Sequence, residues 1–478
     1  MQSGTSRRNV DCAPFSGTLR DMTLQIVTLV FFSIGFWYSV LFKGGVWPSD
    51  WHVSLILIGA GSLIYWSFPS AVRKMPRMGP WLLWPVLLLP LYALLQLVPL
   101  PRNVLSIVSP ERAEQLEGLR QIAQTGLAPL SVLPPATIEY LSRILACLCV
   151  LITIRQITWL SSDRRWAVVI PLLVAGSLEA GLGMFQVAED WPAGAARGTY
   201  VNRDHFAGLL EMCLPLAIMY AVAVWRREDR QTSSRAMPAF AAAGLAGVGG
   251  LMLLGIIYSL SRMGFLVALA SLFLMTLLSI RPRAPSRGWV WLSAVAIGFG
   301  VVLLFVLLPP DQLIARYADK ASTDKITADD RLHMWRESLG LIRAYPWFGC
   351  GLGGFESAFA KFQISLPTFT VDYAHNDYLQ CLAEMGIVGA TIVALLFGTI
   401  FSKAISATWR QQTVDGKCLA VGCISSITAM MLHSLVDFNL QIPANCLALA
   451  WISGVALGLE AQLTRRDRAS RSQSKASP

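Results

Sequence analysis

Residues 386–402 read Gly-Ile-Val-Gly-Ala-Thr-Ile-Val-Ala-Leu-Leu-Phe-Gly-Thr-Ile-Phe-Ser, an apolar run that contains no charged side chain. Extended back to Asp377, this run is long enough to cross the roughly 30 Å of hydrocarbon in a bilayer as one helix. Apolar runs of similar length recur along all 478 residues, and they are continuous rather than alternating, which excludes a membrane β-barrel. The sequence therefore predicts an all-α polytopic membrane protein.

The composition agrees with this fold class, because 54% of the residues are hydrophobic, only 14% are charged, and the mean hydropathy is +0.53. A soluble protein is nearer to about a quarter charged. We expect about twelve spans, at approximately 22–42, 51–69, 80–98, 139–155, 166–188, 205–225, 237–260, 263–280, 288–308, 377–402, 416–434 and 443–463. The first span is too long for a signal peptide and lacks a convincing small-residue cleavage site, so we expect a retained anchor.

The distribution of Lys and Arg predicts the orientation. If the N-terminus lies in the cytoplasm, every short cytoplasmic loop carries at least three basic residues, in agreement with the positive-inside rule. An even number of spans then places both termini in the cytoplasm. The net charge of +10 is explained by this topology and by anionic lipid, so nucleic acid is not an expected partner.

These spans divide the chain into five parts. We expect a cytoplasmic segment over 1–21, a membrane bundle of about nine spans over 22–308, a large periplasmic helical loop over 309–376, three C-terminal spans over 377–463, and a disordered basic tail over 464–478. A second outer segment, residues 99–138, is expected to form a short interfacial helix near 110–124.

The large loop is expected to fold as helix, turn and helix. Apolar residues at helical spacing predict a helix up to about Arg343, and Tyr345-Pro346 ends it. The turn Gly349-Cys-Gly-Leu-Gly-Gly354 matches the letters of a dinucleotide-binding motif, but that motif requires a preceding strand. We therefore expect a packing turn here, with a backbone nest beside an anionic head group as the alternative. A second short helix is expected over 355–362.

Ionisable residues gather at the predicted outer face. They are Arg203, Asp204, His205, Arg262, Arg331, His333, Arg336, His375, His433 and Asp437. Any single arginine at a helix end is expected to snorkel to the interface. As a set, however, several arginines that can bind phosphate oxygens, together with a titratable imidazole, indicate a diphosphate site with a proton acceptor.

Three motifs follow one another in the second half of the chain: Arg331-x3-Trp335, Pro346-Trp-Phe-Gly349-x-Gly351-x-Gly-Gly-Phe355, and His375-Asn-Asp-Tyr-Leu-Gln380-x3-Glu384-x-Gly386-x2-Gly389. In these motifs the chain resembles the superfamily of O-antigen ligases and O-antigen polymerases. Weaker similarity comes from Asn202-Arg-Asp-His-Phe-Ala207, Ser261-Arg262 and His433-x3-Asp437. It covers roughly residues 195–445, whereas the first 190 residues match only in hydropathy.

The resemblance implies a C-type glycosyltransferase fold and a metal-independent reaction without a cofactor. The implied donor is a glycan on undecaprenyl diphosphate, and the implied acceptor is a lipid A core oligosaccharide, a second lipid-linked repeat or a protein hydroxyl. By residue match, His375 would be the base, Arg203 and Arg262 would hold the diphosphate, and Arg331 or Arg336 would help to place it. His205, Asn376, His433 and Asp437 are further candidate substrate-binding residues. The enzyme would act at the periplasmic side of the bacterial inner membrane, among membrane lipids.

Two other classes of function compete with this one. A transporter predicts paired half-repeats and charges near the membrane midplane, but the sequence shows no repeat, and Glu179 is the clearest charge within a span. A structural membrane partner gives no reason for the outer arginines. Within the enzyme class, ligase and exopolysaccharide polymerase both remain open, because they differ in the acceptor.

Overall fold

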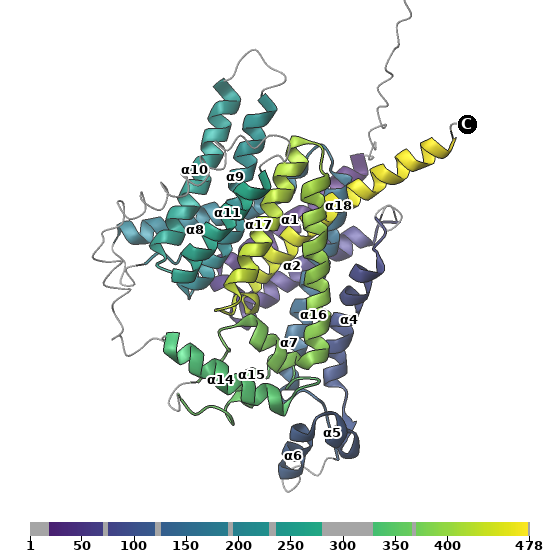
Figure 1. Ribbon diagram of the computed structural model, residues 1–478, viewed down its shortest axis with the longest axis vertical. Coiled ribbons are helices and arrows are strands. Elements are labelled where there is room, and N and C mark those ends of the chain that lie inside the picture. Colours follow the sequence, from purple (N-terminus) through teal and green to yellow (C-terminus); the bar gives the residue numbers. More distant parts are fainter. Residues whose placement is uncertain are drawn as a thin grey trace, which may run out of the picture.

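The computed structural model describes residues 19–69, 75–119, 126–189, 195–228, 236–279, 328–365 and 370–476. Long helices form a bundle, and a smaller helical region covers one end of it (Figure 1). Ten of the described helices are long and apolar enough to cross a membrane. The prediction of an all-α polytopic membrane protein is therefore confirmed.

Eleven of the twelve predicted spans coincide with described helices, and the span expected over 288–308 lies outside the described residues. The eleven helices are α1 (Leu19–Leu41), α2 (Pro48–Trp66), α4 (Pro80–Leu97), α7 (Pro134–Leu160), α8 (Ile170–Ala188), α9 (Arg203–Glu228), α10 (Ala236–Tyr258), α11 (Arg262–Ser279), α16 (Asp377–Arg410), α17 (Val414–His433) and α18 (Pro443–Ala476). Helix α2 is not among the ten apolar helices. Its first turns contain polar residues, including Asp50 and His52.

The remaining elements are short and lie between the long helices. They are η1 (Lys43–Gly45), β1 (Leu100–Pro101), α5 (Arg102–Val108), α6 (Pro110–Leu119), β2 (Leu127–Ala128), η2 (Arg165–Val169), α14 (Ala328–Ala344), α15 (Phe355–Phe359) and η3 (Asn439–Gln441). Strands β1 and β2 pair antiparallel. Helices α5, α6, α14 and α15 lie at the lower end of the bundle in Figure 1, opposite the end at which α9 finishes and α10 begins. The helices expected near 110–124 and up to Arg343 are present as α6 and α14.

The centre of the bundle is built by helices α9, α17 and α18, which are the most buried of the candidate spans. Small residues allow α18 to approach α7 closely. A Cβ at Gly454 would lie 2.7 Å from the Leu151 carbonyl oxygen, and one at Gly458 would lie 2.6 Å from the Arg155 oxygen. Such small-residue contacts are the usual way in which membrane helices gain packing energy.

The C-terminal tail differs from the prediction of disorder over 464–478. Helix α18 continues without interruption to Ala476 and projects beyond the bundle (Figure 1). Residues 464–476 contain neither proline nor glycine, and their Ala, Arg, Lys and Gln residues have good helix propensity, so no residue there ends the helix.

The glycine-rich turn docks onto a break in α16. At Gly386 the backbone has φ 59° and ψ −171°, a conformation open essentially to glycine alone. The N–H groups of Cys350 and Gly351 donate to the carbonyl oxygens of Ala383 and Glu384, at 2.9 and 3.0 Å. In return, the Ile387 N–H donates to the carbonyl oxygen of Pro346 at 2.8 Å. The turn is therefore a packing element that fixes the first two turns of α16.

The backbone N–H groups of this turn bind a carboxylate of the same chain, that of Glu384. The buried Glu384 carboxylate lies against the backbone N–H groups of Gly353 and Phe355, and it accepts a hydrogen bond of 2.8 Å from Gln380 Nε2. The packing-turn interpretation therefore describes the structure, and the acidic group at the nest is a side chain of α16.

Candidate functional site

Asp437 is the centre of a polar cluster in the turn between α17 and η3. Its carboxylate is buried, and imidazole nitrogens from three elements surround it. The Asp437 oxygens lie 3.4 Å from His375 Nδ1, 3.5 Å from His205 Nε2 and 3.9 Å from His433 Nε2. The structure therefore brings together four of the residues that the sequence singled out.

The charge of Asp437 is stabilised by its neighbours. Burial alone would raise the pKa of this carboxyl group, but the charges of His205, His433 and Arg331 and the contact with His375 oppose burial and hold the pKa well below its usual range. These neighbours therefore favour the ionised form of Asp437.

The contacts around Asp437 are longer than ordinary hydrogen bonds. Neither of its oxygens has a conventional hydrogen-bond partner among the described residues, and the same holds for His375 Nδ1 and His205 Nε2. Buried polar groups of this kind are rare in a folded protein and are concentrated at functional sites. Hydrogen bonds of catalytic groups are often long in the absence of substrate and tighten in its presence.

His375 stands at the junction of loop and helix, as the sequence predicted. Its φ of 48° lies in the left-handed region that a non-glycine residue seldom occupies. Asn376 follows as the N-cap of α16: its Oδ1 accepts from the N–H groups of Tyr378 and Leu379, and its Nδ2 donates to the Leu435 oxygen at 2.8 Å. The Asn376 side chain thus fixes the position of His375 and ties it to the turn that carries Asp437.

The ring of Phe438 contacts two of the three imidazoles, those of His205 and His375. The ring of Phe438 meets His205 and His375 edge to face, with centroid distances of 4.5 and 4.7 Å. Tyr373 stacks on Phe438 at 4.4 Å. Phe438 thus packs against the His375 ring, whose Nδ1 faces Asp437 at 3.4 Å.

The predicted arginines occupy different positions around this cluster. Arg331 of α14 donates from Nη1 to the Val436 oxygen at 3.0 Å, and its Nη2 lies 3.9 Å from the Asp204 carboxylate. Arg203 is half-buried at the start of α9, and Arg262 is exposed at the start of α11. A Cβ at Gly264 would touch Ala207 at 2.8 Å, so the two helix starts pack together.

Two predicted positions on α14 stand apart from the cluster core. Arg336 and His333 are both exposed on the surface of that helix. The side chain that α14 contributes next to Asp437 is Arg331, five residues before Arg336.

The candidate residues predicted from the sequence did not include most of the buried acidic residues at this end of the bundle. Glu211 in α9 is 1% exposed, and both its oxygens lie 3.1 Å from His433 Nδ1. Asp377 in the first turn of α16 accepts from Ser434 Oγ at 2.8 Å and from the Leu440 N–H at 3.0 Å. An acid inside an apolar span was itself a signal, since such residues are seldom tolerated without a partner. Glu179, the acid chosen from the sequence, instead binds Thr199 and ties α8 to the segment before α9.

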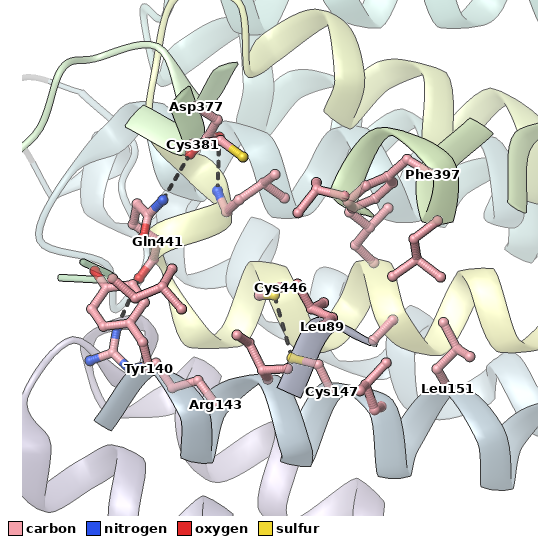
Figure 2. A pocket seen from close by; sticks show the side chains of 18 of the residues that line it. Leu89, Tyr140, Arg143, Cys147, Leu151, Asp377, Cys381, Phe397, Gln441 and Cys446 are labelled. Atoms are coloured by element: carbon pink, nitrogen blue, oxygen red, sulfur yellow. Dashed lines mark hydrogen bonds between the residues drawn. The ribbon is translucent and has the colours of Figure 1, made fainter. Parts of the chain in front are cut away.

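A cavity of about 200 Å³ lies beside the start of α16, between α4, α7, α16 and α18. Its polar end is closed by Gln441, which donates to Asp377 at 3.4 Å and whose carbonyl oxygen accepts from Arg143 at 3.4 Å (Figure 2). Apolar side chains cover the rest, and the sulfur atoms of Cys147 and Cys446 meet there at 3.4 Å. Asp377 thus lines the cavity and also binds the segment that carries Asp437.

The three imidazoles surround a carboxylate and do not converge on one point. Within the described ranges, no three His, Cys, Asp or Glu side chains form an arrangement that could hold a metal ion. The cluster is instead suited to hold and move a proton at His375 Nε2.

A family model described as O-Antigen ligase matches residues 247–394. The matched region runs from α10 to the middle of α16 and contains Arg262, Arg331, Arg336 and His375. A comparison with curated proteins found no match.

Proposed function

This chain is a member of the O-antigen ligase and polymerase superfamily, on the match over residues 247–394, and we propose that it transfers a glycan from undecaprenyl diphosphate to an acceptor hydroxyl. The reaction would take place at the periplasmic face, in the bacterial inner membrane. The observation that supports this most is the contact of 3.4 Å between His375 Nδ1 and Asp437, because it leaves Nε2 as the free basic nitrogen.

The proposed reaction is a displacement at the anomeric carbon of the donor glycan. His375 Nε2 takes the proton of the acceptor hydroxyl, and the acceptor oxygen forms a bond with the anomeric carbon. The bond between that carbon and the diphosphate oxygen breaks, and its electron pair stays with undecaprenyl diphosphate. The in-line geometry inverts the configuration of the anomeric carbon.

The developing charge on the diphosphate requires fixed positive groups. Arg203 and Arg262 stand at the starts of two helices that pack together at this end of the bundle. Guanidinium groups bind phosphate oxygens in pairs and keep their charge at every relevant pH. We assign them to the diphosphate, with Arg331 holding the turn that carries Asp437. These side chains could stabilise the leaving group without a metal ion.

The identity of the acceptor distinguishes the two activities in this superfamily, ligase and polymerase. A lipid A core oligosaccharide would make the protein a ligase, and a second lipid-linked glycan would make it an O-antigen or exopolysaccharide polymerase. Purified protein supplied with each acceptor in liposomes would separate them, because only the true acceptor yields a longer glycan.

The role of His375 is tested by the variants His375→Ala and His375→Gln. Both should lower transfer by about 10²–10⁴-fold, since neither side chain can accept the hydroxyl proton. Consumption of lipid-linked glycan by the purified variants is the measurement. Turnover close to wild type by His375→Gln would contradict a general base, because glutamine can still hydrogen-bond to the substrate.

The proposed sidedness is tested by two single cysteines in a background without native cysteines. Lys361 and Gln412 are both exposed, on the segments at the two opposite ends of α16. A membrane-impermeant maleimide applied to spheroplasts should label Lys361→Cys and should label Gln412→Cys only after lysis. The reverse pattern would place His375 on the cytoplasmic side and contradict the proposal.

A further inference from the structure

Behind Asp437 lies a second ionisable pair that the proposed reaction does not use. Glu211 and His433 are each 1% exposed, and His433 Nδ1 is equidistant, at 3.1 Å, from both Glu211 oxygens. The other ring nitrogen of His433, Nε2, faces Asp437 Oδ2 at 3.9 Å. One imidazole is thus held between two buried carboxylates.

The position of His433 favours its doubly protonated form. A neutral imidazole has a single N–H, so a lone pair would point at one of the two carboxylates. The imidazolium presents an N–H to each of them. It also provides the positive charge without which a buried carboxylate such as Asp437 is very costly.

We propose that Glu211 and His433 are positioning residues of the transfer reaction: Glu211 keeps His433 protonated and oriented, and His433 keeps Asp437 ionised toward His375. This inference rests on the proposed role of His375 as the base. Neither residue touches substrate. They act through Asp437, which holds the N–H of His375 on Nδ1 and leaves Nε2 free.

Other charged groups lie around Asp437 and His433 and belong to the charge balance. Asp204 and His205 come from α9, Arg331 from α14, and His375 and Asp377 from the start of α16. Arg331 and His205 also support the charge of Asp437. Removing one charge at Glu211 therefore weakens the arrangement and does not abolish it.

The direction of the pH effect follows from the charges. If Glu211→Gln leaves His433 neutral, Asp437 loses a positive neighbour and binds a proton more readily. A protonated Asp437 no longer holds the N–H of His375 on Nδ1, so the acid limb of the activity profile should move to higher pH, by about one unit.

The experiment compares Glu211→Gln and Glu211→Asp in purified protein, with transfer rates measured across pH. Glu211→Gln should lower the rate at neutral pH by about 10- to 100-fold, the effect of losing a hydrogen bond to a charged group. Its acid limb should move upward. Glu211→Asp keeps the charge, so its acid limb should stay near that of the wild type even where its rate falls.

Glu179→Gln is the matched control. Glu179 is another fully buried carboxylate, in α8, and it accepts hydrogen bonds from the backbone N–H and the hydroxyl group of Thr199. Loss of its charge should change thermal stability and leave the acid limb in place. If Glu211→Gln behaves in the same way, Glu211 is a packing residue and the inference is wrong.

Failure of the proposed function would look different. Absence of transfer by the wild-type protein, or full activity of His375→Gln, would contradict the role of His375 itself. An unchanged acid limb in Glu211→Gln, in a protein that does depend on His375, would contradict only the positioning pair.

Discussion

Two buried aspartates at one end of the bundle, Asp377 and Asp437, are satisfied to very different degrees. The Asp377 carboxylate accepts hydrogen bonds from Ser434, Leu440 and Gln441, all of them in the segment that follows α17. The Asp437 carboxylate has imidazole nitrogens at 3.4–3.9 Å and no conventional hydrogen bond among the described residues. Burial alone does not distinguish them, because both are at most 4% exposed.

The difference separates a framework acid, Asp377, from Asp437, which belongs to the proposed reactive site. Asp377 anchors the first turn of α16 to the segment that contains Asp437, and Glu384 does the same for the glycine-rich turn. A buried acid whose oxygens are all bonded locks a backbone arrangement. An acid that faces several imidazoles with incomplete bonds has capacity left for a proton or for a rearrangement during the reaction.

The largest expected contrast is between Asp437→Asn and Asp377→Asn. Asp437→Asn should lower transfer by about 10²–10⁴-fold, because an amide facing His375 Nδ1 favours the tautomer whose Nε2 carries the proton. The folded protein should remain close to wild type in thermal stability. Transfer rates and thermal unfolding of the purified variants are the measurements.

Asp377→Asn should show the opposite pattern. Its new NH₂ group would face N–H donors that now bind a carboxylate, at a cost of about 1–3 kcal/mol in the free energy of unfolding. Activity per folded molecule should fall less than in Asp437→Asn. Equal loss of activity in both variants, with equal stability, would break the distinction between framework and reactive acids.

A second prediction concerns the framework side at Gly386. Alanine there must adopt φ 59°, and its Cβ would lie 2.4 Å from the carbonyl carbon and oxygen of Trp347. Gly386→Ala should therefore destabilise the protein by more than about 3 kcal/mol. Gly398→Ala is the control in the same helix, because a Cβ there meets nothing within 4 Å. Similar unfolding temperatures for the two variants would show that the turn is not fixed by this contact.

The sequence predicted the framework of helices well. Continuous apolar runs must form helices in a bilayer, since no water can bond the backbone. The span expected over 80–98 is α4 at Pro80–Leu97, and the His375-Asn376 junction is indeed the start of α16. The break at Gly386 could not be predicted, because it depends on contact with a turn about 35 residues earlier in the chain.

Only the local part of the candidate site could be predicted from the sequence, again because contacts between distant segments leave no local pattern. The motif around His375 is local, so the sequence displayed it directly. The convergence of His205, His433 and Asp437 depends on α9 packing against α17, which no spacing within either helix reveals. Asn376 was expected to bind substrate, and the structure uses its amide group as a helix cap, a role that the sequence Asn-Asp-Tyr also permits.

The smallest expected effect sharpens the comparison on α14, where Arg331 and Arg336 differ in their surroundings. Arg331 binds the Val436 oxygen next to Asp437, whereas Arg336 is exposed. Arg331→Ala should reduce transfer by roughly tenfold, because a hydrogen bond from a charged group contributes about 1.5–3 kcal/mol and part of it is replaced by water. Arg331→Lys should restore only part of this loss, since an ammonium group cannot contact Val436 and Asp204 together as a guanidinium does.

Arg336→Ala is the matched comparison on the same helix, and its transfer rate should stay within about threefold of wild type, as expected for a solvated surface charge. Transfer rates at saturating donor and acceptor measure all three variants. A greater loss in Arg336→Ala than in Arg331→Ala would mean that the exposed face of α14 binds substrate, and the reactive region would then extend beyond the cluster around Asp437.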